Sequence, residues 1–170
     1  NHTRVDFNRA LELCREHSIS LAPTFVAFNP WSTLAGYLDM LGELLRLKLV
    51  ESVPPIQLAI RLLVPQGSYL LHLPGFEDRL EAFDSTMLGY PWKHADPLVD
   101  ALQLQVMDIA MRMEDAPRGE VFNAIWQLAH DTAGLPTPTL DNADFGETIA
   151  HLSEPWYCCA EPTDQQLQSF

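Results

Sequence analysis

The amino-acid sequence predicts an α/β fold, a helix–strand–helix–strand unit followed by a mostly α-helical acidic extension and a tail. Two short apolar runs, 19–28 and 56–64, are rich in β-branched and aromatic residues and enclose a helical pattern. Beyond residue 75 apolar residues recur at helical spacing and the charge becomes strongly negative. We therefore expect an α/β segment at 1–74, a helical extension at 75–139 and an acidic tail at 140–170.

The first part of the chain alternates helical and strand-like patterns. Thr3 and Asp6 are helix-capping residues, and apolar side chains recur at helical spacing from there to His17. The run 19–28 predicts a buried strand, and the run 56–64, which follows two prolines, predicts a second one. Between them a stripe of leucines predicts a helix, at positions 34, 38, 41, 45 and 49.

A strand, a helix and a strand in this order form a parallel pair with a right-handed crossover. Because two strands cannot make a stable parallel sheet alone, we expect the unit to be the last part of a larger α/β sheet or barrel. The chain is accordingly expected to be a piece of a longer protein.

Polar residues in the second predicted strand suggest a buried charge. Alternation places Gln57 and Arg61 on one face of that strand. A guanidinium there needs an anionic partner. That partner is either a carboxylate on a strand missing from this chain, in an internal salt bridge, or the carboxylate or phosphate of a ligand, and the sequence leaves both open.

Composition restricts the possible functions. The chain has 170 residues, is 47% hydrophobic and 19% charged, and carries a net charge of -13. Six basic and six acidic side chains fall in residues 1–75, so four basic and seventeen acidic ones fall in 76–170. Such a chain is expected to be globular, with no nucleic-acid partner. Its apolar runs are too short to span a membrane, so we expect no membrane partner.

The acidic half contains further helical patterns. A short helix is expected at 76–83, a rigid aromatic loop at 89–97, and longer helices at 98–113 and 118–133, the last ended by Gly134. No glycine-rich phosphate loop, nucleophile elbow or metal-binding histidine pair occurs.

The cysteines are the most distinctive chemical groups. An odd count of three is not a disulfide framework and predicts a reducing, cytoplasmic environment. Cys14 lies on the core face of the first helix and is expected to be inert. Cys158 and Cys159 are adjacent, and such a pair can form a vicinal disulfide, bind a soft metal, act as a redox pair, or be buried without a function.

Several segments together carry a resemblance to a known family. The tail segment Cys-Cys-Ala-Glu-Pro at 158–162 resembles the one that names the CUAEP/CCAEP-tail radical S-adenosylmethionine (SAM) (seleno)proteins. In some members selenocysteine occupies the place held here by Cys159. Three other segments are similar to the same family, at 23–33, 57–68 and 90–97.

The resemblance implies the C-terminal part of a partial (β/α) radical SAM barrel, with 19–29 and 56–65 as its fifth and sixth strands. Intact proteins of this kind hold a [4Fe–4S] cluster and SAM, and some also use cobalamin. The implied cofactor-binding residues are Phe28, Pro30, Gln57, Arg61, Leu63 and Val64. The turn after the fifth strand departs from the broader superfamily pattern, since Phe28, Trp31 and Ser32 replace Gly, Gly and Glu.

The cysteine motif that holds the cluster, Cys-x-x-x-Cys-x-x-Cys, does not occur in this chain, which therefore supplies no metal ligands for it. The expected function is that of a radical SAM enzyme in the intact parent, acting on an unknown small-molecule or peptide substrate. This chain alone is expected to be inactive without the N-terminal part. Cys158 and Cys159 are the candidate catalytic residues, in a redox or ligand role. The alternative is a non-catalytic acidic interaction module with a vicinal-thiol tail that is redox-active or binds a soft metal.

Overall fold

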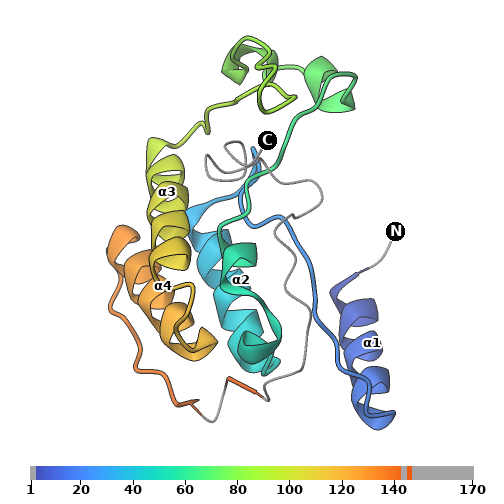
Figure 1. Ribbon diagram of the computed structural model, residues 1–170, viewed down its shortest axis with the longest axis vertical. Coiled ribbons are helices and arrows are strands. Elements are labelled where there is room, and N and C mark those ends of the chain that lie inside the picture. Colours follow the sequence, from blue (N-terminus) through green and yellow to red (C-terminus); the bar gives the residue numbers. More distant parts are fainter. Residues whose placement is uncertain (1–2, 143–144, 147–170) are drawn as a thin grey trace.

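The computed structural model describes residues 3–142 and 145–146, and four α-helices organise this part of the chain (Figure 1). The helices are α1 (Arg4–Glu16), α2 (Leu34–Arg46), α3 (Pro97–Arg112) and α4 (Arg118–Thr132). Single 3₁₀ turns lie between α2 and α3, at Val50–Ser52, Pro55–Leu58, Tyr69–His72 and Glu77–Arg79.

The four α-helices are where local sequence signals place them, whereas the short helix expected at 76–83 is wrong and only a 3₁₀ turn forms there, at Glu77–Arg79. Thr3 and Asp6 form a reciprocal capping box at the start of α1. The Thr33 hydroxyl accepts a hydrogen bond from Gly36 N at the start of α2. Gly134 ends α4 with a φ of 65°, and the N–H of the next residue, Leu135, donates to His130 O. The predicted helices at 98–113 and 118–133 are thereby confirmed to within a residue or two.

The predicted strands, and with them the partial (β/α) barrel, are wrong. The described residues contain isolated β-bridges and no sheet. Residues 19–27 run without regular structure, and Pro23 has no N–H with which to extend a ladder. Pro55 begins a 3₁₀ turn that reaches Leu58, because its fixed φ suits a helical turn. A parallel pair without further neighbours has too few hydrogen bonds to become a sheet.

The main core lies between α2, α3 and α4, with α4 against both of the others. Leu41 from α2, Val106 from α3 and Ile125 from α4 are completely inaccessible to solvent. Burial of such side chains contributes about 1.5–3 kcal/mol each. Helix α1 lies beside this body in Figure 1 and adds Leu11 to the same cluster.

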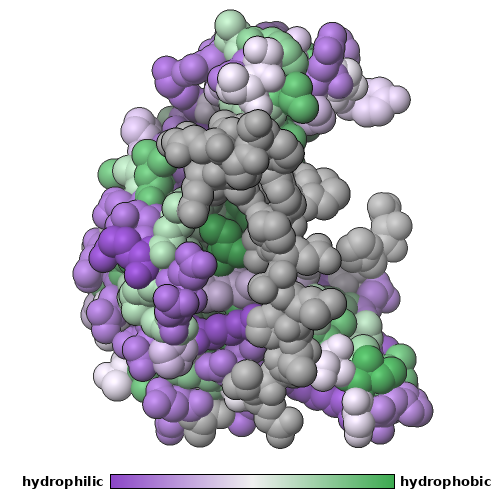
Figure 2. Space-filling model, in the orientation of Figure 1, coloured by the Kyte–Doolittle hydropathy of each residue, from purple (hydrophilic) through white to green (hydrophobic). Residues whose placement is uncertain are grey.

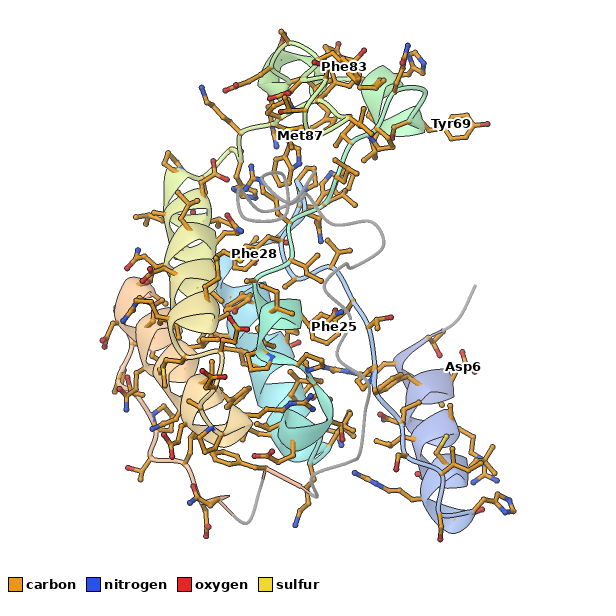
Figure 3. All side chains as sticks on the ribbon, in the orientation of Figure 1. Asp6, Phe25, Phe28, Tyr69, Phe83 and Met87 are labelled. Atoms are coloured by element: carbon orange, nitrogen blue, oxygen red, sulfur yellow. The ribbon has the colours of Figure 1, made fainter. Side chains whose placement is uncertain are left out.

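A second, smaller apolar cluster forms the cap, by which we mean residues 62–94. Its centre is Val64, Phe76 and Trp92, and antiparallel bridges tie its loops together, including Leu80 with Trp92. The cap stands at one end of the helical body (Figure 1). Tyr69 projects from it, with 90% of its surface exposed (Figure 3).

The step in charge near Pro74 does not coincide with a break in packing. The cap cluster joins Val64 to Phe76, on opposite sides of Pro74, and the main core joins α2 to α3 and α4. Hydrophilic residues cover much of the visible surface over α3 and α4 (Figure 2). Among the described residues, none of the helices has the length and apolar character needed to cross a membrane.

Candidate functional site

The first candidate site is the junction between the two segments that were predicted as strands. Phe28 and Arg61 form a single parallel β-bridge. Phe28 N donates to Ile60 O at 2.9 Å, and Leu62 N donates to Phe28 O at 2.9 Å. The two segments therefore meet in the predicted parallel direction, although for one bridge only.

The side chains at this junction are largely occupied by contacts within the chain. Phe28 is 1% exposed and its ring lies 4.7 Å from that of Tyr37. The Tyr37 hydroxyl donates to Leu58 O at 2.9 Å, and burial raises the pKa of Tyr37, so the phenol stays neutral. Gln57 is buried and accepts a hydrogen bond from Phe25 N at 3.3 Å.

The remaining predicted cofactor contacts, Pro30, Leu63 and Val64, make packing and hydrogen-bonding contacts within the described part of the chain. Val64 is inaccessible within the cap cluster, and Leu63 lies against Gly89, where an added Cβ would approach Leu63 Cδ1 to 2.7 Å. Pro30 is buried, and its carbonyl accepts from Arg79 Nη1 at 3.4 Å. The structure thus brings these residues to one end of the body as packing and hydrogen-bonding groups.

Arg61 connects three elements. Its Nη1 lies 2.7 Å from Oδ1 of Asp100 in α3, its Nη2 donates to Trp92 O, and its Cζ lies 3.7 Å from the Trp92 ring centroid. Asp100 Oδ2 also accepts from His94 N at 2.9 Å. The anion that the sequence required for this guanidinium is present in the protein, on a helix instead of on a strand.

The described residues do not fit an iron–sulfur cluster. They contain one cysteine, Cys14, which is half-buried and free, and no group of three or more potential metal ligands. A cluster of this kind needs three thiolates. Cys158 and Cys159 lie outside the described residues.

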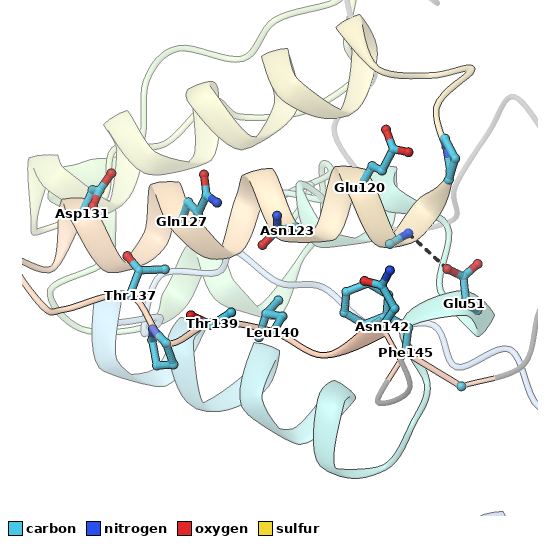
Figure 4. A pocket seen from close by; sticks show the side chains of 14 residues that line it. Glu51, Glu120, Asn123, Gln127, Asp131, Thr137, Thr139, Leu140, Asn142 and Phe145 are labelled. Atoms are coloured by element: carbon cyan, nitrogen blue, oxygen red, sulfur yellow. Dashed lines mark hydrogen bonds between the residues drawn. The ribbon is translucent and has the colours of Figure 1, made fainter.

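The second candidate site is the α4 groove, a cavity of about 680 Å³ between α4 and the described residues 137–142 and 145–146. Four exposed side chains follow one stripe of α4, namely Glu120, Asn123, Gln127 and Asp131 (Figure 4). The opposite wall is the irregular segment that carries Thr137, Thr139, Leu140 and Asn142, with Phe145 and Gly146 at one end.

Buried aromatic residues hold the two walls together. Trp126 Nε1 donates to Pro138 O at 3.0 Å, which fixes the segment beside α4. Phe145 packs edge-on against Phe122, with ring centroids 6.1 Å apart. At the same end Glu51 Oε1 accepts from Gly119 N at 3.1 Å, the dashed line in Figure 4. The groove is therefore a fixed feature of the described fold.

Sequence reasoning missed this groove. The available signal was the polar stripe of α4, where residues at 120, 123, 127 and 131 share a face. The second wall gives no local signal, because it is held there by Trp126 and Phe122, both far from it in sequence.

Comparison with known proteins found no similar protein. No protein-family model, curated protein sequence or solved structure matches the chain.

Proposed function

We propose that this chain is the C-terminal part of a radical SAM enzyme of unknown substrate. One observation supports this proposal beyond the tail motif. Three separate segments carry the resemblance, and Arg61 of one contacts a residue of each of the other two, Phe28 through the β-bridge and Trp92 through its ring and carbonyl oxygen. Contact of one residue with both other segments is the arrangement expected if the three segments belong to one functional unit.

The proposal assigns the radical chemistry to residues outside this chain. A cluster held outside this chain would supply the chemistry expected of the intact enzyme, which is one-electron reduction of SAM to methionine and a radical that takes a hydrogen atom from the substrate. The described residues cannot hold the cluster, so no step of that reaction is assigned to them. Their role is to fix the end of the body that carries the junction.

The test uses the complete reading frame that contains Asn1. We expect a Cys-x-x-x-Cys-x-x-Cys motif upstream, and 5′-deoxyadenosine from the anaerobically purified protein with SAM and a strong reductant. Alanine at one motif cysteine is the control that should abolish it. A reading frame without the motif, or a cluster-bearing protein that leaves SAM intact, would contradict the proposal.

A second experiment probes the junction in that intact protein. Arg61→Lys keeps the charge but removes the planar fork that contacts both Trp92 and Asp100. We expect the cluster absorbance to persist while 5′-deoxyadenosine formation falls about tenfold, the equivalent of about 1.4 kcal/mol. Arg112→Lys, on the exposed face of α3, is the matched control.

The tail pair is proposed to act late in the reaction, as a redox pair or as ligands. Replacing both Cys158 and Cys159 with serine in the intact protein should leave SAM cleavage in place and abolish turnover to product. Full turnover by this double variant would exclude a catalytic role for the pair.

The second candidate function is the acidic interaction module, favoured by the open α4 groove. A start codon just upstream of Asn1, with no cluster motif, would favour it over the enzyme.

A further inference from the structure

We propose that the α4 groove binds an extended, basic segment of another protein. This inference is independent of radical SAM chemistry, because it involves neither the junction nor the cysteine tail. It depends on the shape of the groove, the amide pair of α4 and the charge of the surrounding chain.

The two carboxamides of the groove suit a peptide backbone. Asn123 and Gln127 are exposed and four residues apart on α4, so their side chains are displaced by about 6 Å along the helix. An extended chain repeats every two residues, about 6.6–6.8 Å. Since each carboxamide offers a donor and an acceptor, the pair can bind peptide groups that lie on the same side of an extended strand.

The facing wall also offers backbone groups. Thr137 and Thr139 lie in an irregular stretch, and their N–H groups donate no hydrogen bond within the described part of the chain. An extended segment beside them can accept those bonds, as in strand addition. A polyamine, which has no carbonyl groups, could not.

The charge of the groove determines which side chains a bound peptide segment should carry. Glu120 and Asp131 lie at the two ends of the stripe, about 16 Å apart along the axis, which is the span of about five extended residues. Both are exposed, and neither forms an ion pair with any residue that the structure describes. No Lys or Arg lines the groove. A guest with a cation near each end would complement them.

Charge also favours a partner from solution over the chain's own tail as the occupant. No Lys or Arg follows Arg118, while residues 147–170 contain Glu147, Glu154, Glu161 and Asp164. An acidic segment would be repelled from the groove, and the overall charge of -13 would attract a basic partner from solution. The same argument applies to the tail of a second copy.

The probe is a fluorescein-labelled peptide, Lys-Thr-Val-Thr-Lys, titrated with the complete chain at low salt and followed by fluorescence anisotropy. We expect saturable binding with a dissociation constant of about 100 μM or tighter, weakened by added salt. The peptide with both lysines replaced by glutamate should not bind. Absence of saturation by the lysine peptide would overturn the proposal.

Two sets of variants locate the binding. The pair Glu120→Gln with Asp131→Asn should weaken it about fivefold, and Asn123→Ala with Gln127→Ala about tenfold. The matched controls are Glu114→Gln with Asp115→Asn, which make the same charge change on exposed residues outside the groove, and Gln105→Ala on α3. Equal losses in the charge variants and their control would show non-specific attraction and overturn the proposal.

The backbone contribution is tested by methylating alternate amide nitrogens of the probe. We expect the methylated peptide to bind about tenfold more weakly, because it loses the N–H groups that donate to the carboxamide oxygens of Asn123 and Gln127. Its carbonyl groups can still accept from the N–H groups of Thr137 and Thr139. Spermidine should compete weakly. Unchanged binding after methylation, or spermidine binding as tightly as the peptide, would show that the groove recognises charge alone and would contradict peptide recognition.

Discussion

Arg61 forms an ion pair with Asp100 in the first turn of α3, with Nη1 2.7 Å from Oδ1. The Arg61 side chain is 12% exposed and that of Asp100 is 28% exposed, so solvent screens this pair less than the surface pairs. The pair joins the Phe28–Arg61 bridge to the helical body.

Asp100→Asn should lower the free energy of unfolding by about 1–3 kcal/mol, because it removes a carboxylate paired with a largely buried guanidinium. Urea denaturation followed by circular dichroism measures this. Asp108→Asn is the matched control, since its pair with Arg112 is more than half exposed on both sides, and it should cost under about 0.5 kcal/mol. Equal effects would mean that the Arg61 pair contributes no more than a surface contact.

Gln103→Leu should destabilise the protein by about 1–3 kcal/mol. Gln103 is buried in α3, and its Nε2 donates to Ala59 O at 3.1 Å, so leucine leaves a buried carbonyl unpaired. Gln105→Leu, on the exposed face of the same helix, should change stability by less than about 0.5 kcal/mol. Urea denaturation measures the stability of both variants. If Gln103→Leu leaves the free energy of unfolding unchanged, water or a rearrangement satisfies Ala59 O.

Gly119→Ala and Gly42→Ala should change the stability of the protein in opposite directions. A Cβ on Gly119 would lie 2.4 Å from Phe145 Cδ2, so Phe145 must move, at a cost of about 1–3 kcal/mol. A Cβ on Gly42 meets nothing within 4 Å inside α2, so alanine should stabilise by about 0.5–1 kcal/mol. The melting temperatures of the two variants, compared with that of the unchanged protein, test both expectations. A stable Gly119→Ala protein would contradict the packing of Phe145 on α4.

The N-terminal cap of α1 should depend on pH. Hydrogen bonds from the backbone and side chain of Thr3 lower the pKa of Asp6. A carboxyl whose pKa is lowered on folding stabilises the helix above its unfolded pKa, about 3.9, and this contribution is lost as the pH falls through the folded value. A titration of the Asp6 carboxyl by NMR checks the direction. In Thr3→Ala the pKa should rise, and an unchanged value would show that the capping box is absent in solution.

The helices were predictable because their signals are local. Thr3, Asp96 and Gly134 end or begin helices through contacts within a few residues, and the leucine stripe of α2 marks its buried face. The strands were not predictable in this way, because an apolar run becomes a strand only when partners supply its hydrogen bonds. Residues 19–27 have none of the required strand partners within the described chain. The second apolar run begins in a 3₁₀ turn instead of a strand, because Pro55 favours that turn.

The candidate sites likewise combine features that local sequence indicates with features that depend on packing between distant segments. The largely buried guanidinium of Arg61 does have an anionic partner, but the strand alternation that suggested it is wrong, and the partner is Asp100 of α3 instead of a missing strand or a ligand. The stripe on α4 is visible in the sequence, whereas the second wall of the groove depends on the hydrogen bond from Trp126 to Pro138, across residues with no shared pattern.

Helices α3 and α4 form a hairpin closed by a five-residue connection, 113–117, and share the most extensive contact between elements. Closing so short a loop costs little chain entropy, and helical pairs of this kind assemble in microseconds to milliseconds. We therefore expect this hairpin to form the folding nucleus, with α2 and the cap docking onto it afterwards. Kinetic unfolding of core variants should then show high φ-values at Val106 and Ile125 and low ones at Phe76 in the cap.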